Sequence, residues 1–333
     1  MTSKERLLAA MRGRPIDRVA NMPLIKQFCA RQVGISFRDY NRDHRVLVEC
    51  QLRMRERWDI DCFNVTGFAY REAGDCGLPL TWLADAPPHP DGVLVTERRD
   101  IAALRWPAPW DGPLMSDRLA AIRLFKERRP DIAVHGWVEG PFAQAATFHG
   151  LEQTMADLVL EPDLLRALMD YIVPHEAAFA RAQLDAGAEI IGIGDAAASV
   201  IGPASYREVV LPYERELIRA IHAHGGLVKL HICGDITHLL PDIARTGADM
   251  VDIDWMVDLR RARAVLGTEV CLCGNFDPVA VLLQAGPDDV RDACRRCIVE
   301  AGTPFVLSAG CEVPADTGAD NFGAMCERYL PAL

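Results

Sequence analysis

Short apolar segments alternate with helical patterns along this chain, and this alternation constrains its fold more than any other feature. The apolar segments begin near residues 19, 62, 132, 189, 227, 250, 269 and 304. Helical patterns follow several of them, over residues 162–186, 236–246 and 287–301 among others. Strands that alternate with helices form βαβ units in a parallel sheet, and eight such strands close a barrel. The sequence therefore predicts the α/β class and a (β/α)8 TIM barrel.

Three details complete this prediction. A short helical extension over residues 4–12 precedes the first strand, and the proline-rich residues 79–109 interrupt the alternation. That segment predicts an inserted loop or hairpin, which is either a lid or partner surface or a passive insertion. A doubly wound open sheet is the competing architecture, but no glycine-rich phosphate fingerprint follows the first strand. Since α/β barrels reach roughly 250 residues and more as one unit, we expect residues 1–333 to form one domain.

The composition bears on partners and compartment. A net charge of −11 argues against nucleic acid, because proteins that bind phosphate backbones carry a basic patch or stripe. No stretch approaches the ~20 apolar residues that cross a bilayer, and the first residues lack the apolar centre of a signal peptide. The 11 cysteines are an odd number spread over a long chain, which favours reduced thiols over a disulfide framework. We therefore expect a cytoplasmic protein that contacts neither membrane nor nucleic acid.

Polar and metal-binding residue types gather where the predicted strands end. A (β/α)8 barrel places its chemistry at the C-terminal ends of its strands, whereas residues at the other end serve stability. In this chain the C-terminal ends carry Glu139, Asp195, His231, Cys233, Asp254, Asn275, Asp277, Cys311 and Glu312. The opposite ends carry mostly Gly, Ala and Arg. One face of the barrel is therefore predicted to be functional.

The most specific of these groups is the pair His231 and Cys233. Because side chains alternate along a strand, residues two apart project to the same side. An imidazole and a thiolate there suit zinc, which prefers nitrogen and sulfur ligands in tetrahedral geometry, and Cys311 after the last strand offers a third ligand. Cys271 and Cys273 form a rival pair with the same spacing, but with no histidine beside them we interpret them as core or rim thiols. The sequence predicts a zinc site at the barrel mouth.

Several motifs together resemble a known family. They run from Glu5-Arg6 through Arg14-Pro15-Ile16-Asp17-Arg18, then Glu139-Gly140-Pro141-Phe142, Asp195-Ala196-Ala197-Ala198-Ser199, Pro212-Tyr213, His231-Ile232-Cys233-Gly234-Asp235, Gly274-Asn275-Phe276-Asp277-Pro278 and Gly310-Cys311-Glu312-Val313-Pro314. On these motifs the chain resembles the uroporphyrinogen decarboxylase superfamily, and within it the zinc-dependent methyltransferases that act with corrinoid proteins. The similarity covers essentially the whole chain.

The resemblance implies a ligand set. In the methyltransferase branch the zinc ligands fall on His231, Cys233 and Cys311, and some members add an acidic ligand that substrate displaces. The matching position here is Asp254, with Asp252 as the near alternative. The decarboxylase branch instead holds its acidic substrate with an N-terminal arginine motif, and the corresponding residues 22–28 contain no arginine. The methyltransferase branch is therefore favoured.

The resemblance also implies a reaction. A methyl group would move between a corrinoid (cobalamin) carried by a partner corrinoid protein and a small acceptor or donor, such as the thiol coenzyme M or tetrahydrofolate. Zinc would activate a thiol, whereas a pterin would need a carboxylate for its proton. Candidates for that catalytic work are Asp195, Glu139 and Asp254, although strand-end carboxylates also cap helices.

Some assignments stay open at this stage. Asn275 and Asp277 are assigned to cofactor binding, and a homodimer is a further expected association. The sequence does not choose between thiol and tetrahydrofolate, and it does not fix the direction of transfer. The alternative function is a metal-free lyase of the decarboxylase type or a substrate-binding protein on the same fold.

Overall fold

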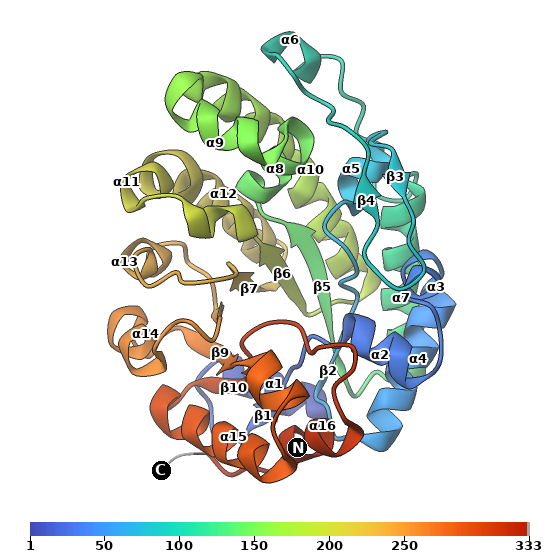
Figure 1. Ribbon diagram of the computed structural model, residues 1–333, viewed down its shortest axis with the longest axis vertical. Coiled ribbons are helices and arrows are strands. Elements are labelled where there is room, and N and C mark those ends of the chain that lie inside the picture. Colours follow the sequence, from blue (N-terminus) through green and yellow to red (C-terminus); the bar gives the residue numbers. More distant parts are fainter. Residues whose placement is uncertain (332–333) are drawn as a thin grey trace.

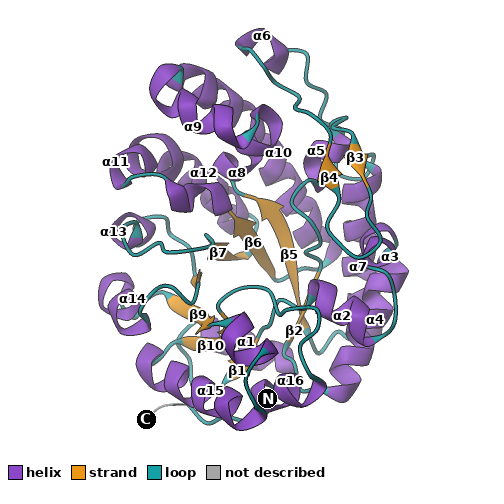
Figure 2. Ribbon diagram, in the orientation of Figure 1, coloured by secondary structure: helices purple, strands orange, loops and turns teal. Residues whose placement is uncertain are grey.

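The structure, a computed structural model, describes residues 1–331 and forms a nearly closed barrel of parallel strands with helices around it (Figures 1 and 2). The eight strands lie in the order β1-β10-β9-β8-β7-β6-β5-β2. Their bounds are β1 Ala20–Asn21, β2 Cys62–Asn64, β5 Ala133–Glu139, β6 Ile190–Gly194, β7 Leu227–His231, β8 Met250–Ile253, β9 Cys271–Phe276 and β10 Phe305–Ala309. Each strand lies where the sequence places an apolar segment, so the predicted (β/α)8 TIM barrel is confirmed.

The helices follow the strands in turn and form the outer layer (Figure 1). Their bounds are α1 Ser3–Met11, α2 Lys26–Gln32, α3 Phe37–Arg42, α4 His44–Arg57, α5 Arg71–Asp75, α6 Arg98–Ile101, α7 Pro113–Arg128, α8 Pro141–His149, α9 Leu151–Leu160, α10 Pro162–Ala186, α11 Pro203–Ser205, α12 Leu211–Ala223, α13 Leu240–Ile243, α14 Leu259–Leu266, α15 Pro287–Ala301 and α16 Ala319–Met325. Short 3₁₀ or π-helical turns lie at Ala196–Val200, Tyr206–Val210 and Pro278–Leu283. No helix within residues 1–331 has the length and apolar character needed to cross a membrane.

Of the helices predicted over residues 162–186 and 236–246, the first forms over its whole range and the second does not. Helix α10 occupies the predicted residues 162–186 and ends at Gly187, whose φ of 115° is the left-handed conformation that glycine adopts at helix ends. The predicted helix over 236–246 is wrong, since only α13 (Leu240–Ile243) forms there. Pro241 lacks an N–H and its ring clashes with the preceding turn, which favours a helix that begins beside it, although the much longer α10 accommodates Pro174 in its interior.

The inserted segment contains the predicted hairpin. Strands β3 (Leu80–Thr81) and β4 (His89–Pro90) pair in antiparallel fashion, and α6 follows them at the edge of the molecule (Figure 1). The segment is fixed to the end of α8, because the main-chain N–H groups of Leu94 and Val95 donate to Phe148 O at 2.8 and 3.0 Å. These contacts hold the insertion against the helical layer.

The N-terminal helix packs against the strand starts. Leu7 and Met11 of α1 form a buried cluster with side chains of the strands, and this cluster includes Cys271 and Cys273. Both thiols are fully buried in apolar surroundings, which raise the pKa of each. The structure therefore places the rival cysteine pair in the core, as the sequence interpretation expected.

Asp61 connects β1 and β2, the first and last strands in the order of the sheet. Its main-chain N–H donates to Asn21 O of β1 at 3.1 Å, and its carboxylate accepts from Asn21 N at 3.0 Å. The same buried carboxylate accepts from Arg6 at 2.7 Å and from Arg18 at 2.7 and 2.9 Å. Asp61 therefore links α1, β1 and the start of β2 across the barrel seam.

Replacing Asp61 with asparagine is expected to lower the free energy of unfolding by about 2–3 kcal/mol, since hydrogen bonds to charged groups contribute about 1.5–3 kcal/mol and the new amide faces guanidinium donors. Urea denaturation measures the change. Asp59→Asn is the matched control, because Asp59 is half exposed and pairs with Arg18 and Arg55 at the surface, where such pairs contribute about 1 kcal/mol or less. Equal losses in the two variants would contradict a role for Asp61 in the seam.

Candidate metal centre

Two loops at the C-terminal ends of the strands carry the predicted metal ligands. His231 is the last residue of β7 and Cys233 follows in the next turn, where Gly234 has a φ of 89° that other residues rarely adopt. Cys311 follows β10 after Gly310, at which a Cβ atom would lie 2.5 Å from Trp255 N. Only glycine at this position lets the second loop pass close enough to bring Cys311 toward β7.

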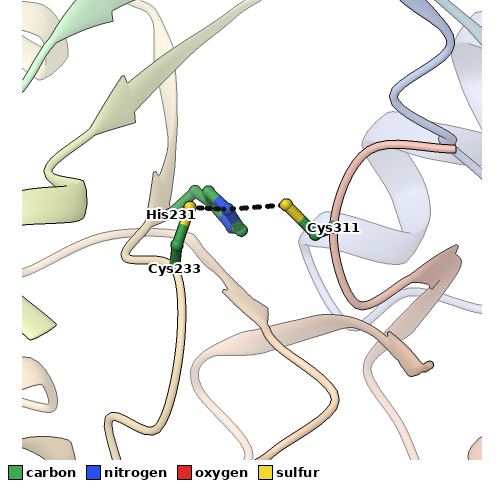
Figure 3. Close-up of side chains that lie close together, drawn as sticks. All are labelled: His231, Cys233 and Cys311. Carbon is green, nitrogen blue, oxygen red and sulfur yellow. Dashed lines mark hydrogen bonds between the residues drawn. The ribbon is translucent and has the colours of Figure 1, made fainter. Parts of the chain in front are cut away.

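The three predicted ligands lie together (Figure 3). His231 Nε2 is 3.1 Å from Cys233 Sγ and 4.0 Å from Cys311 Sγ, and the three atoms lie within 4.8 Å of one another. A tetrahedral zinc ion with its usual bond lengths of about 2.0–2.3 Å would hold such atoms roughly 3.5–3.8 Å apart. Both the donor atoms and their spacing therefore fit zinc with only small adjustments.

Asp252 orients the histidine of this group. Its Oδ2 lies 3.2 Å from His231 Nδ1 and 2.7 Å from Lys229 Nζ, and all three side chains are buried. Burial alone would raise the pKa of Asp252, but the charges of Lys229 and His231 hold that pKa well below its usual range. A carboxylate at Nδ1 leaves Nε2 directed at the two cysteines, which is the arrangement that supporting residues give to metal-binding histidines.

Asp254 lies beside the three residues but outside their group. Its Oδ2 accepts from Gly234 N and its Oδ1 from Trp255 N, each at 2.7 Å. Burial raises the pKa of this carboxyl. Oδ2 thus stabilises the turn that carries Cys233 and Oδ1 the turn after β8, and an exchangeable bond from Asp254 to the metal would require one of these hydrogen bonds to open. Asp252, the alternative, contacts the far side of the imidazole.

The two thiols influence each other. A hydrogen bond from Cys233 and the neighbouring His231 lower the pKa of Cys311 to about 4, although burial opposes the change. The pKa of Cys233 is correspondingly raised. The lowered pKa favours the thiolate form of Cys311, and thiolate is the form of cysteine that binds metal.

A cavity of about 180 Å³ opens beside the three ligands. The remaining lining residues are Leu24, Lys26, Thr66, Gly67, Phe68, Ala69, Trp137, Glu139, Gly194, Ala196 and Glu312. Glu139 accepts a hydrogen bond from Trp137 Nε1 at 2.9 Å, and burial together with the nearby Glu72 charge raises its pKa to about 8. Lys26, Phe68 and Trp137 were not among the predicted site residues. Lys26 and Phe68 follow β1 and β2, so the strand-end rule could have found them.

The other predicted residues lie in local hydrogen bonds near the strand ends. Asp195 is fully buried and accepts from Phe142 N and Ala143 N at 3.3 and 2.6 Å, which stabilises the first turn of α8. Burial raises its pKa to about 7. Asn275 Nδ2 donates to Val257 O at 2.7 Å, and Asp277 caps the turn Pro278–Leu283. The structure does not place these three side chains in the group of His231, Cys233 and Cys311, which we call the metal group. Their catalytic and cofactor-binding roles stay predictions.

The sequence of this chain matches a protein family and several proteins of known activity. The profile of the family "Uroporphyrinogen decarboxylase (URO-D)" matches residues 2–329. The chain is 28% identical over 341 residues to methylcobamide:CoM methyltransferase MtbA of Methanosarcina mazei, with 98% of this chain and 97% of that protein covered. It is 29% identical over 259 residues to uroporphyrinogen decarboxylase of Gloeobacter violaceus, with 74% and 72% covered.

The fold has a close counterpart among solved structures. A methyltransferase from Methanosarcina mazei superposes with a TM-score of 0.89 at 23% identity, covering 98% of this chain and 97% of the other. At that identity the likeness bears on the fold alone, and it agrees with the barrel. The family predicted from the motifs is confirmed by the profile match: this chain belongs to the uroporphyrinogen decarboxylase (URO-D) family.

Proposed function

We propose that this chain is a zinc-dependent methyltransferase that moves a methyl group between a corrinoid, delivered by a partner corrinoid protein, and a small thiol. The observation that carries the proposal is the group of His231, Cys233 and Cys311 at one wall of a cavity. The predicted class agrees with relatives that match nearly the whole chain, since those proteins are named methylcobamide:CoM methyltransferases. Residues 1–333, whose last two lie outside the described part, would act as one barrel domain.

The residues around the cavity have distinct tasks in this proposal. His231, Cys233 and Cys311 would hold the zinc ion, which would supply Lewis-acid chemistry that lowers the pKa of a substrate thiol. Asp252 fixes the ring of His231, and Glu139 accepts the proton that the thiol releases. Leu24, Phe68 and Trp137 provide an apolar wall that limits the water around the reacting sulfur.

The size of the cavity supports a thiol over the other acceptors. Cavities that enclose drug-sized ligands measure roughly 300–1,000 Å³, whereas this one measures about 180 Å³. A pterin or a tetrapyrrole would exceed this space, but a thiol of a few carbon atoms fits. The zinc-type donor set would also have no task in a metal-free lyase.

Zinc analysis combined with a methyl-transfer assay tests the proposed function. The purified protein is expected to contain close to one zinc per chain, as a single site with three protein ligands requires. With methylcobalamin as donor it should demethylate the corrinoid only when a small thiol is present. A metal-free preparation with full activity would refute the zinc mechanism.

Glu139→Gln is expected to lower kcat/KM by about a hundredfold, the scale of general-base catalysis. Because the pKa of Glu139 is raised to about 8, the carboxylate forms as pH rises, so the rate of the unmodified enzyme should increase through pH 8. The variant should lose this pH dependence. Trp137→Phe removes a hydrogen bond that lowers this pKa, so the rise should move to higher pH. A pH profile that is the same in all three proteins would exclude Glu139 as the base.

A further inference from the structure

The charges on the cavity wall restrict which thiol can enter. Lys26 is the single cationic side chain among the lining residues, and its Nζ is 2.8 Å from Glu312 Oε2. The other oxygen of Glu312 accepts from Gln27 N at 3.1 Å. The carboxylate is therefore held at both oxygens, and it occupies the position that an anionic group of a substrate would need beside Lys26.

The buried arginine side chains Arg71 and Arg118 also form ion pairs with carboxylates. Arg71 donates to Glu72 and Arg118 to Asp117, each at 2.6 Å, and both guanidinium groups are buried. Two more buried carboxyl groups, Glu139 and Glu176, stand near Arg71, and burial together with the charge of Glu72 raises their pKa values. Each of these two guanidinium groups is therefore matched by a carboxylate of its own, as Lys26 is matched by Glu312.

The rest of the wall is apolar. Leu24, Phe68 and Trp137 contribute hydrocarbon or aromatic surface, and Ala69 and Ala196 add small side chains. With the two thiolates of Cys233 and Cys311, a bound Zn²⁺ site would carry no net charge. A small neutral thiol can occupy such a space without desolvating a charge, whereas a sulfonate or carboxylate would lie close to the carboxylate of Glu312.

We propose that the thiol substrate of this chain is small and uncharged, and that Glu312, by holding Lys26, excludes anionic thiols. This inference rests on the proposed function. Like charges placed together without water cost several kcal/mol, so discrimination arises from repulsion as much as from fit. The relatives named for coenzyme M use an anionic thiol, 2-mercaptoethanesulfonate, and this chain would differ from them in that respect.

The test compares two thiols with the same two-carbon chain, 2-mercaptoethanol and 2-mercaptoethanesulfonate, using the zinc-loaded protein and methylcobalamin. The neutral thiol is expected to give a kcat/KM at least about tenfold higher, and titration calorimetry should show tighter binding of the same thiol. Glu312→Gln frees Lys26 and should shift the ratio at least about tenfold toward the sulfonate. Glu269→Gln, an exposed residue before β9, should leave the ratio unchanged.

The outcomes separate the inference from the proposed function. Transfer to both thiols with equal or greater efficiency for the sulfonate overturns the inference and leaves the methyltransferase intact. Absence of transfer to either thiol by zinc-loaded protein overturns the proposed function itself. An unchanged ratio in folded, zinc-loaded Glu312→Gln overturns the role of Glu312. If that variant does not fold, the ratio and the binding affinities of the unmodified protein still decide whether the substrate is neutral.

Discussion

Replacing Cys311 with alanine is expected to remove the bound zinc and to lower methyl transfer by about 10³-fold or more. A catalytic zinc ion needs three protein ligands, and two do not hold it; Lewis-acid activation lowers a reaction barrier by several kcal/mol. His231→Ala should have the same effect, because Nε2 of His231 lies 3.1 and 4.0 Å from the two sulfur atoms and forms a triangle with them (Figure 3). Metal content by atomic absorption and the methylcobalamin assay measure the two consequences.

A matched cysteine variant distinguishes the site from general damage. Cys76 is a half-buried free thiol at the end of α5 and does not belong to the group of His231, Cys233 and Cys311, so Cys76→Ala should keep its zinc and its activity. The double variant of His231 and Cys311 should be no worse than either single variant, since residues that act as one unit are not additive. Zinc retained at full stoichiometry in Cys311→Ala would exclude Cys311 as a ligand.

Asp252→Asn is expected to lower the free energy of unfolding by about 3–5 kcal/mol, because it leaves the charge of Lys229 buried without a partner. It should also weaken zinc binding by about 10–100-fold, the usual consequence of removing the group that orients a ligand histidine. Urea denaturation of the zinc-free protein gives the first quantity, so that ligand binding does not add to stability. Competition with a chelator gives the second.

The double variant Lys229→Met with Asp252→Asn separates the two effects. With neither charge of this pair left, its stability should recover most of the loss, since neutral replacement of a buried pair is often harmless. Its zinc affinity should stay low, because His231 Nδ1 still lacks its carboxylate. Recovery of zinc affinity together with stability would show that Asp252 acts only as the partner of Lys229.

The fold was predictable because its signals are local. Each strand lies in a mainly apolar segment, and helices such as α15 carry the helical spacing of apolar residues over the predicted range. The failure at residues 236–246 has a local contribution as well, since Pro241 favours a helix start beside it. The chain needs no long-range information to form this order of elements.

The metal group was partly predictable. His231 and Cys233 were found by the two-residue spacing of a strand, and Cys311 by its place after the last strand, although 80 residues separate it from His231. The choice between Asp252 and Asp254 could not be made in this way. Asp252 pairs in register with His231 across β7 and β8, so it meets the imidazole, whereas Asp254 lies past the end of β8 and binds the turn after β7.

The sequence by itself determined the order of strands and helices and the nitrogen and sulfur donors that lie together at the proposed zinc site. Only the tertiary structure decided what surrounds those ligands. The Glu312 carboxylate accepts from Gln27, a residue 285 positions away, and its neighbour Lys26 completes the ion pair that removes the free cation from the cavity. Strand and helix periods report on neighbours along the chain, whereas the charge of a cavity depends on side chains that meet only when the barrel closes.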